Sequence, residues 1–417
     1  MTGGASVAGA AASEVPGGVA SDLPSEVASG VTSAGPGGAA GEVLRARAYL
    51  SRVAEPPAAA LIGFVEAVGP VSAAARVRAG DVPDAVARET SARRCVDSVD
   101  ADLTAARAVG ARLLVPEDPA WPHWAFASFA LAGSSALVPP VALWVRGPLA
   151  AEPATERSVA VVGSRAATGY GMHVAGEFGA GLAAAGATVV SGAAIGVDGS
   201  AHRGALAADG PTVAVLACGI DRAYPAAHAT LLDRIGACGL VVSEYPPGSI
   251  PARHRFLVRN RLIAAFGRGT LVVEAGVRSG AQRTAADALA LGKPLMAVPG
   301  PITSGRSAGC HRLIREGALL VTRPEEVLEV VGRLGVDLAL ERVAPALPTD
   351  GLRRAVALVH DALPVCGARD VRWLSRESGV PADDVRAALG ELERRGLARF
   401  RDGQWRLAEP GEGNPVR

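Results

Sequence analysis

The chain has few of the residues that build disulfide frameworks and structural metal sites. Its 417 residues include 5 cysteines, which lie far apart and form no Cys-x-x-Cys pair: Cys95, Cys218, Cys238, Cys310 and Cys366. Small secreted domains use an even set of closely spaced cysteines, and structural zinc sites use paired ones. We therefore expect reduced thiols, a cytoplasmic protein and no bound metal ion.

Long apolar runs and a strong net charge are also missing. No stretch of 18 apolar residues occurs, and the first basic residue is Arg45, so a secretory signal would lack its charged start. We expect no membrane partner. The net charge of +1 favours no class of partner, and Lys293 is the only lysine. Any inference from charge about a binding partner therefore depends on where the arginines lie in the sequence.

The N-terminal part divides by composition. Residues 1–41 are mostly Gly, Ala, Ser, Val and Pro with no aromatic residue, which predicts a disordered tail because too little apolar surface can be buried. A second such tail is expected at 409–417. Residues 42–110 have a helical pattern, and Gly69-Pro70 marks a stop after an apolar helix.

Two interpretations of residues 42–110 stay open. The region could be a helix-hairpin-helix or SAM-like module that grips a DNA backbone through the N–H groups of its turn, or a small helical packing domain. We favour packing, because no basic cluster flanks the turn. Residues 111–157 then supply two short lead-in strands, at 111–115 and 143–147, and the loop between them.

Residues 158–335 alternate apolar β-runs with helical patterns, which predicts a parallel sheet covered on both faces. The expected fold class is α/β, an extended Rossmann-like, doubly wound and mostly parallel sheet. Its first strand, Val159 to Val162, runs into the turn Gly163-Ser164-Arg165. A turn from a strand into a helix N-terminus suits an anion, and the guanidinium fork of Arg165 suits phosphate. A phosphate is therefore expected there.

The second strand ends in Ser191-Gly192, and Asp198 and His202 follow four residues apart on one helical face. A metal site is disfavoured because no third ligand is in sight. We expect Asp198 to orient His202 or to cap the helix, which would leave His202 at the mouth of the sheet. No acidic residue closes this strand to hold a ribose, so neither NAD nor another cofactor is expected.

The densest charge lies between residues 253 and 283, with seven arginines against Glu274 alone. Two interpretations of this charge run are possible. It could be a solvated helix face or, as we favour, a track for a single-stranded nucleic acid in which the arginines point one way. Tyr245 and Phe256 are then the candidate rings on which bases could stack. Ser279 and Gly280 at a strand end would let a backbone approach phosphates. For Glu274 we favour a structural ion pair with the arginines.

Beyond a linker at 336–349, residues 350–408 have the pattern of three helices and two short strands about Asp402-Gly403, which is typical of a winged helix. Its charge is nearly balanced. DNA binding and a docking or autoinhibitory role are equally compatible with it.

The motifs in residues 158–331 together resemble one known family. They are Gly163-Ser164-Arg165 with Thr168 and Tyr170-Gly171, Ser191-Gly192 with Asp198 and Ala201-His202, Gly219-Ile220-Asp221, Tyr224-Pro225, Ser243-Glu244-Tyr245-Pro246, Arg259-Asn260-Arg261, Val273-Glu274-Ala275, Ser279-Gly280 and Val298-Pro299-Gly300. This set resembles the DNA-processing protein A family, DprA or Smf. Weaker similarity extends to the lead-in strands and the winged helix.

The resemblance implies a non-catalytic protein that binds single-stranded DNA without sequence preference, forms a homodimer, and loads the RecA recombinase in natural transformation or recombination. It implies dimer and RecA surfaces near residues 295–331. Carried over by motif, the DNA-binding residues would be Gly163, Ser164, Arg165, Ser191, Gly192, His202, Arg259, Asn260, Arg261, Ser279 and Gly280.

Two other functions are weighed against this. A Rossmann-like enzyme that cleaves nucleoside monophosphates at the glycosidic bond could use Glu274 and Arg278, although the expected glycine-rich loop is missing. A transcription regulator could act through the winged helix, and it would bind a specific duplex without residues 158–331.

Overall fold

The computed structural model describes residues 38–333, 335–339 and 347–408. The chain splits into two compact units, Met1–Ala339 and Leu340–Arg417, and each is described by itself. The tails expected at 1–41 and 409–417 lie outside the described residues, except that α1 already begins at Ala39. Part of the expected linker, residues 340–346, also lies outside them.

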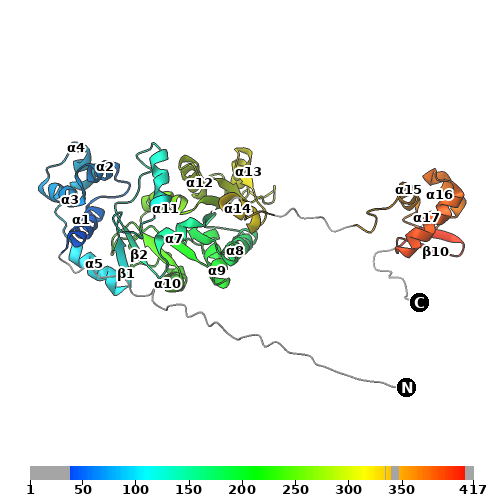
Figure 1. The fold of residues 1–417 in the computed structure, drawn as a ribbon, viewed down its shortest axis with the longest axis horizontal. Coiled ribbons are helices and arrows are strands. Elements are labelled where there is room, and N and C mark those ends of the chain that lie inside the picture. The colour runs from blue at the N-terminus through cyan, green and yellow to red at the C-terminus, as the bar shows by residue number, and fades with distance from the viewer. Residues whose placement is uncertain (1–37, 334, 340–346, 409–417) are drawn as a thin grey trace, which may run out of the picture. The chain divides into compact units, whose positions relative to one another are not determined.

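Five helices begin the first unit (Figure 1, blue to cyan): α1 Ala39–Val53, α2 Ala59–Val68, α3 Pro70–Ala79, α4 Asp84–Thr90 and α5 Val99–Ala108. Gly69 ends α2 at a φ of 80°, and Pro70 starts α3, because proline fits the first helical position, where its missing N–H costs nothing. Apolar side chains of these helices, such as Leu50 and Leu61, share one core with Trp144 and Val241 of the sheet.

Among the described residues, no single helix is long and apolar enough to cross a membrane. Helices α2 and α3, bent by 120° at the break between them, pass that test together by length and composition alone.

A nine-stranded sheet organises the rest of this unit, in the order β1-β2-β6-β5-β4-β3-β7-β8-β9. The strands from β3 onward are parallel, whereas β1 and β2 form an antiparallel edge that joins through β2 to β6. The bounds are β1 Ala111–Leu114, β2 Leu143–Arg146, β3 Ser158–Val162, β4 Thr188–Ser191, β5 Thr212–Leu216, β6 Leu240–Ser243, β7 Gly269–Val272, β8 Leu295–Ala297 and β9 Leu319–Leu320. The Rossmann-like α/β fold is therefore confirmed, and the lead-in strands belong to the same sheet.

Helices cover both faces of this sheet. Alternate residues of β3 point to opposite faces: Val159 packs with α8 and α9, and Ala160 packs with α11 and α12. Figure 1 shows α8 and α9 below the sheet and α11 and α12 above it. The helices are α6 His123–Phe126, η1 Ala127–Leu131, α7 Ala151–Glu156, α8 Gly169–Ala184, α9 Val197–Ala207, η2 Ala226–His228, α10 Ala229–Cys238, α11 Arg253–Phe266, α12 Ala281–Ala290, α13 Ala308–Arg315 and α14 Pro324–Val331.

The second unit has its own core, which includes Val359, Leu374 and Leu389. It consists of α15 Arg354–Ala362, α16 Val371–Ser378, α17 Ala382–Arg394 and the hairpin of β10 Ala398–Arg401 and β11 Gln404–Leu407. Asp402 and Gly403 both have positive φ, as a two-residue hairpin turn of type I′ requires. These are the expected elements, and the winged helix itself stays a prediction.

Candidate nucleic-acid interface

A cavity of about 620 Å³ opens at the carboxyl ends of β3 and β7, and its lining is rich in arginine. Five arginines line it: Arg165, Arg253, Arg259, Arg278 and Arg306. We call it the arginine cavity. The other lining residues are Val162, Gly163, Ser164, Ala166, Ala194, Asp198, Phe256, Leu257, Asn260, Ile263, Gly276, Ser279, Gly280, Ala281 and Thr284.

The place of this cavity follows from the order of the strands. From β3 the chain proceeds through β4, β5 and β6 on one side, and it then crosses to β7 on the other side of β3. Helices leave the sheet in opposite directions at such a switch point, so a crevice forms beyond the carboxyl ends of the two central strands. The turns after β3 and β7 therefore line one cavity.

The N-terminus of α8 lies next to a carboxylate of the protein itself, that of Glu274. Glu274, 2% exposed, follows β7, and its Oε2 accepts hydrogen bonds from the N–H of Thr168 at 2.9 Å and from the Thr168 hydroxyl at 3.2 Å. A Cβ on Gly171 would collide with this oxygen. The predicted ion pair between Glu274 and the arginines is wrong, because the carboxylate caps α8 instead. The positive end of the helix thus faces a carboxylate of the protein itself, and the cationic side chains of the cavity lining are the arginines.

Arg165 lines the arginine cavity and packs against an aromatic ring. Its guanidinium lies over the ring of Phe256, 4.7 Å from the ring centroid. Arg306 donates a hydrogen bond to the carbonyl oxygen of Ala166, the residue after Arg165. Cation and ring therefore lie together, which is the combination that binds phosphates and bases in single-strand binding proteins.

Arg259 is held more rigidly than Arg165. It is 3% exposed, and its Nη1 donates to the carbonyl oxygens of Gly192, at 2.9 Å, and of Val215. Burial lowers the pKa of Arg259 to about 10, with Asp198 opposing the shift, so the guanidinium stays charged at neutral pH. Burial likewise raises the pKa of Asp198, against the effect of Arg259. Asp198 is the only acidic residue in the described lining, so the cavity has a positive excess.

Comparisons with known proteins agree with this geometry. The family model described as DNA recombination-mediator protein A matches residues 112–332, a range that includes every residue of the cavity lining. A Mycobacterium tuberculosis protein named as a DNA processing protein DprA is 51% identical over 372 residues, which cover 88% of this chain and 95% of the relative.

The chain belongs to the DNA recombination-mediator protein A family. This confirms the resemblance to DprA and Smf seen in the sequence.

Solved structures of family members are similar as well. The crystal structure of DNA processing protein A from Streptococcus pneumoniae aligns with a TM-score of 0.57 at 30% identity, over 70% of this chain and 98% of that chain. A structure of DNA processing protein A from Helicobacter pylori, described for its single-stranded DNA binding mode, aligns with a TM-score of 0.45 at 27% identity, over 52% of this chain and 94% of that chain.

Most of the residues expected to bind DNA from the family motifs do meet in one place. Seven of them line the arginine cavity: Gly163, Ser164, Arg165, Arg259, Asn260, Ser279 and Gly280. Phe256 lines it too, and Gly192 lines a smaller hollow next to it. A Cβ on Gly192 would lie 2.5 Å from the Arg259 guanidinium, so glycine lets this arginine pass close to the backbone.

His202 and Ser191 do not reach the mouth of the sheet. Both are completely buried. His202 Nδ1 lies 2.7 Å from the Thr212 hydroxyl, which itself donates to the carbonyl of Val189, and the Ser191 hydroxyl donates to the carbonyl of Val161. Burial lowers the pKa of His202 to about 3, so the ring is neutral. The prediction that His202 lies at the mouth of the sheet is therefore wrong. Thr212 orients the ring, and Asp198 does not, because Asp198 accepts a hydrogen bond from the Ala194 N–H.

Arg261 and Tyr245 are interior residues as well. Arg261 is 1% exposed, and its Nη2 lies 2.7 Å from Oε1 of Glu244. Tyr245 is 2% exposed, and the guanidinium of Arg255 lies over its ring at 4.7 Å. A buried ring has no free face, so the prediction that Tyr245 stacks on a base is wrong. Arg261 likewise has no surface to offer a phosphate.

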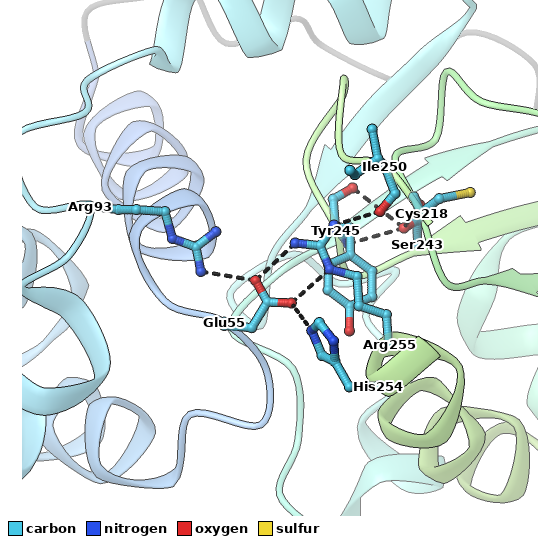
Figure 2. Close-up of polar contacts among 8 residues, drawn as sticks. All are labelled: Glu55, Arg93, Cys218, Ser243, Tyr245, Ile250, His254 and Arg255. Carbon is cyan, nitrogen blue, oxygen red and sulfur yellow. Dashed lines mark hydrogen bonds and ion pairs between the residues drawn. The ribbon is translucent and has the colours of Figure 1, made fainter. Parts of the chain in front are cut away.

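The arginines of α11 point in several directions, contrary to expectation. Arg253, Phe256 and Asn260 follow the i, i+3, i+7 spacing of one helix face, which faces the cavity. Arg255 lies on the other side, where its Nε and Nη2 donate to Glu55 at 2.7 and 2.9 Å. Figure 2 shows Glu55 between Arg93 on one side and His254 and Arg255 on the other.

This carboxylate comes from the loop between α1 and α2, so the helical region fixes the first turn of α11. Partial burial would raise the pKa of Glu55, but the hydrogen bonds from Arg255 and His254 outweigh it and hold the pKa below its ordinary value. Glu55 thereby links the helical region to Arg255 and His254 at the start of α11.

Three lining arginines, Arg253, Arg278 and Arg306, were missed as site residues. Arg306 contacts a turn 140 residues earlier in the chain, and nothing local in the sequence indicates this contact. Arg253 and Arg278 were counted in the run of seven arginines, and Arg278 was also considered for the enzyme alternative. That alternative also needs Glu274 in the cavity, and the structure places this carboxylate in the α8 cap. No group of three or more His, Cys, Asp or Glu that could hold a metal ion occurs in the described part of the chain.

Proposed function

We propose that the arginine cavity binds single-stranded DNA without sequence preference. The observation that carries the proposal is a concave site lined by five arginines, one buried acid and an aromatic ring. Membership of a DNA recombination-mediator family supports it.

Charge and shape together favour a single strand. Guanidinium groups bind phosphate oxygens with paired hydrogen bonds, and such contacts carry no sequence information. Proteins read duplex DNA with a helix or ribbon that protrudes into a groove, whereas a hollow receives a strand whose bases are unstacked. Phe256, half-buried beside Arg165, offers a ring on which any base can stack.

Reversing the charge of Arg165 tests this. Arg165→Glu should weaken binding of oligonucleotides of any sequence, measured by fluorescence anisotropy. The slope of log affinity against log salt should fall by about 0.7 for each phosphate that the variant no longer neutralises. Arg234→Glu on α10 is the matched control, because Arg234 is exposed and lies outside the cavity lining. Normal binding by Arg165→Glu would contradict the proposal.

We further propose that the bound strand is passed to RecA and that the chain acts as a homodimer. The family resemblance supports both, and residues 295–331 include the short edge strand β9 with Leu319 and Leu320 at 49% and 53% exposure. Exposed apolar residues on a sheet edge favour association. Light scattering of Leu319→Asp tests the dimer. Filament formation by RecA on strands coated with single-strand binding protein tests the transfer, and no acceleration by the wild-type protein would contradict it.

A further inference from the structure

Asp198, near the start of α9, is the one acidic residue in the described lining of the arginine cavity. It is buried, at 7% exposure, and its Oδ2 accepts a hydrogen bond from the N–H of Ala194 at 3.4 Å. Arg165 and Arg259 act on it through their charge, but neither forms an ion pair with it. A buried carboxylate without a paired cation is costly to keep ionised, so its protonation depends on the other charges in the cavity.

Three other titratable groups lie around Asp198 and Arg259: His202 on α9, Cys218 after β5 and His228 in η2. Burial lowers the pKa of His202 to about 3 and raises the pKa of Cys218 to about 11, so neither changes its charge near neutral pH. The His228 ring lies against Gly199, the residue after Asp198. A proton taken up beside the arginines near neutral pH therefore belongs to Asp198 or to His228.

We propose that a strand enters the arginine cavity together with a proton, which the Asp198 carboxylate takes up from the solvent; this rests on the proposed function. A phosphodiester brings a second negative charge into the cavity that Asp198 lines, and it draws on the same cations, Arg165 and Arg259. Two anions that share a site repel each other, and a proton on one of them removes the repulsion. The phosphodiester is much the stronger acid, so the proton goes to the carboxylate.

Linkage gives the direction of the effect on binding. Burial raises the pKa of Asp198 in the free protein, against the opposing charges of Arg259 and Arg165, and a bound phosphate that shields those charges raises it further. The coupling is reciprocal: if bound DNA favours the protonated carboxyl, the protonated carboxyl favours bound DNA by the same factor. Affinity therefore rises as pH falls through the pKa of Asp198, by up to about tenfold per pH unit for one proton.

The test measures binding of oligo-dT to the full-length chain between about pH 5.5 and 8.5, a range in which neither thymine nor the phosphodiester titrates. The wild type should bind more tightly at lower pH. Its binding heat, measured in two buffers of different ionisation enthalpy, should show net proton uptake. Asp198→Asn keeps an oxygen for the Ala194 N–H and removes the charge, so it should bind more tightly than the wild type at the alkaline end and lose the pH dependence. Loss of a merely structural residue would instead weaken binding.

Two variants serve as controls. His228→Gln should retain the proton uptake. Asp233→Asn on α10, whose side chain is 72% exposed and lies outside the cavity lining, should match the wild type in affinity and pH dependence. Uptake that persists in Asp198→Asn, or that disappears in His228→Gln, would overturn the inference.

The wild-type measurement decides even if Asp198→Asn fails to fold, because equal proton-corrected heats in the two buffers would mean that no proton accompanies the strand. Arg165→Glu separates this inference from the proposed function. If Arg165→Glu weakens binding and the wild type takes up no proton, this inference alone is overturned. If Arg165→Glu binds normally, the proposed function fails.

Discussion

Replacing Arg261 by methionine should destabilise the protein and leave the DNA site intact. Arg261 on α11 and Glu244 after β6 form a buried ion pair, with side-chain exposures of 2% and 6% and an N–O distance of 2.7 Å. Methionine fills much of the volume of arginine, so the main effect of the substitution on stability is electrostatic. It leaves the Glu244 carboxylate in the interior without its cation.

The expected magnitude follows from that burial. Removing one partner of a buried pair typically costs about 3–5 kcal/mol, a large share of the roughly 5–15 kcal/mol by which domains are stable. For a unit of this size the midpoint of thermal unfolding should fall on the order of 10 °C. A surface arginine that binds phosphate would instead cost less than about 0.5 kcal/mol.

Thermal unfolding and oligonucleotide binding, measured on the same preparation, separate the two roles. Arg261→Met should unfold earlier and, at a temperature where it is folded, bind with wild-type affinity. The double variant Arg261→Met with Glu244→Leu should recover part of the lost stability, because both charges are then absent. A normal melting temperature with weakened binding would refute the reasoning and return Arg261 to the DNA site.

Three further variants probe the same framework. Glu55→Gln should be less stable than the wild type at neutral pH, and the difference should shrink as pH falls below about 4.5, because the pKa of Glu55 is lowered in the folded state and its stabilisation is lost on protonation; a constant difference would contradict this. His202→Gln should remove a loss of stability that the wild type shows as pH falls from 6.5 toward 3, at up to about 1.4 kcal/mol per pH unit, because the buried ring stays neutral while the unfolded chain takes up a proton. Gly192→Ala should cost about 1–3 kcal/mol in urea unfolding because its Cβ would collide with Arg259. Gly280→Ala is the matched control, since nothing lies within 4 Å of its Cβ.

Local pattern was enough to predict the central strands and the first turn. The run Val159 to Val162 is apolar throughout, as a strand covered on both faces must be, and Gly163-Ser164-Arg165 does lie at the carboxyl edge. The pairing of β2 with β6 was not predictable in this way, because it joins residues such as Trp144 and Ser243 that are remote in the sequence. Which strands become neighbours is decided by the packing of the whole unit.

The same limit explains the errors at the site. Composition counted the arginines of α11 as one group, and helical spacing does not sort them either, because Arg259 lines the cavity although it follows Arg255 by four residues. The acids that bind Arg255 and Arg261, Glu55 and Glu244, are identified only by the folded arrangement. The role of Glu274 depends likewise on β7 lying beside β3, which brings its carboxylate to the start of α8.

Photocrosslinking tests the central claim most directly. The full-length protein is irradiated with a single-stranded oligonucleotide that carries 5-iodouracil, and the adducts are mapped by mass spectrometry. We expect them at residues that border the arginine cavity, above all Phe256, and we expect Arg165→Glu to abolish them. Adducts confined to the α2–α3 turn or to residues 347–408 would contradict the account and place the strand on the helical region or on the second unit.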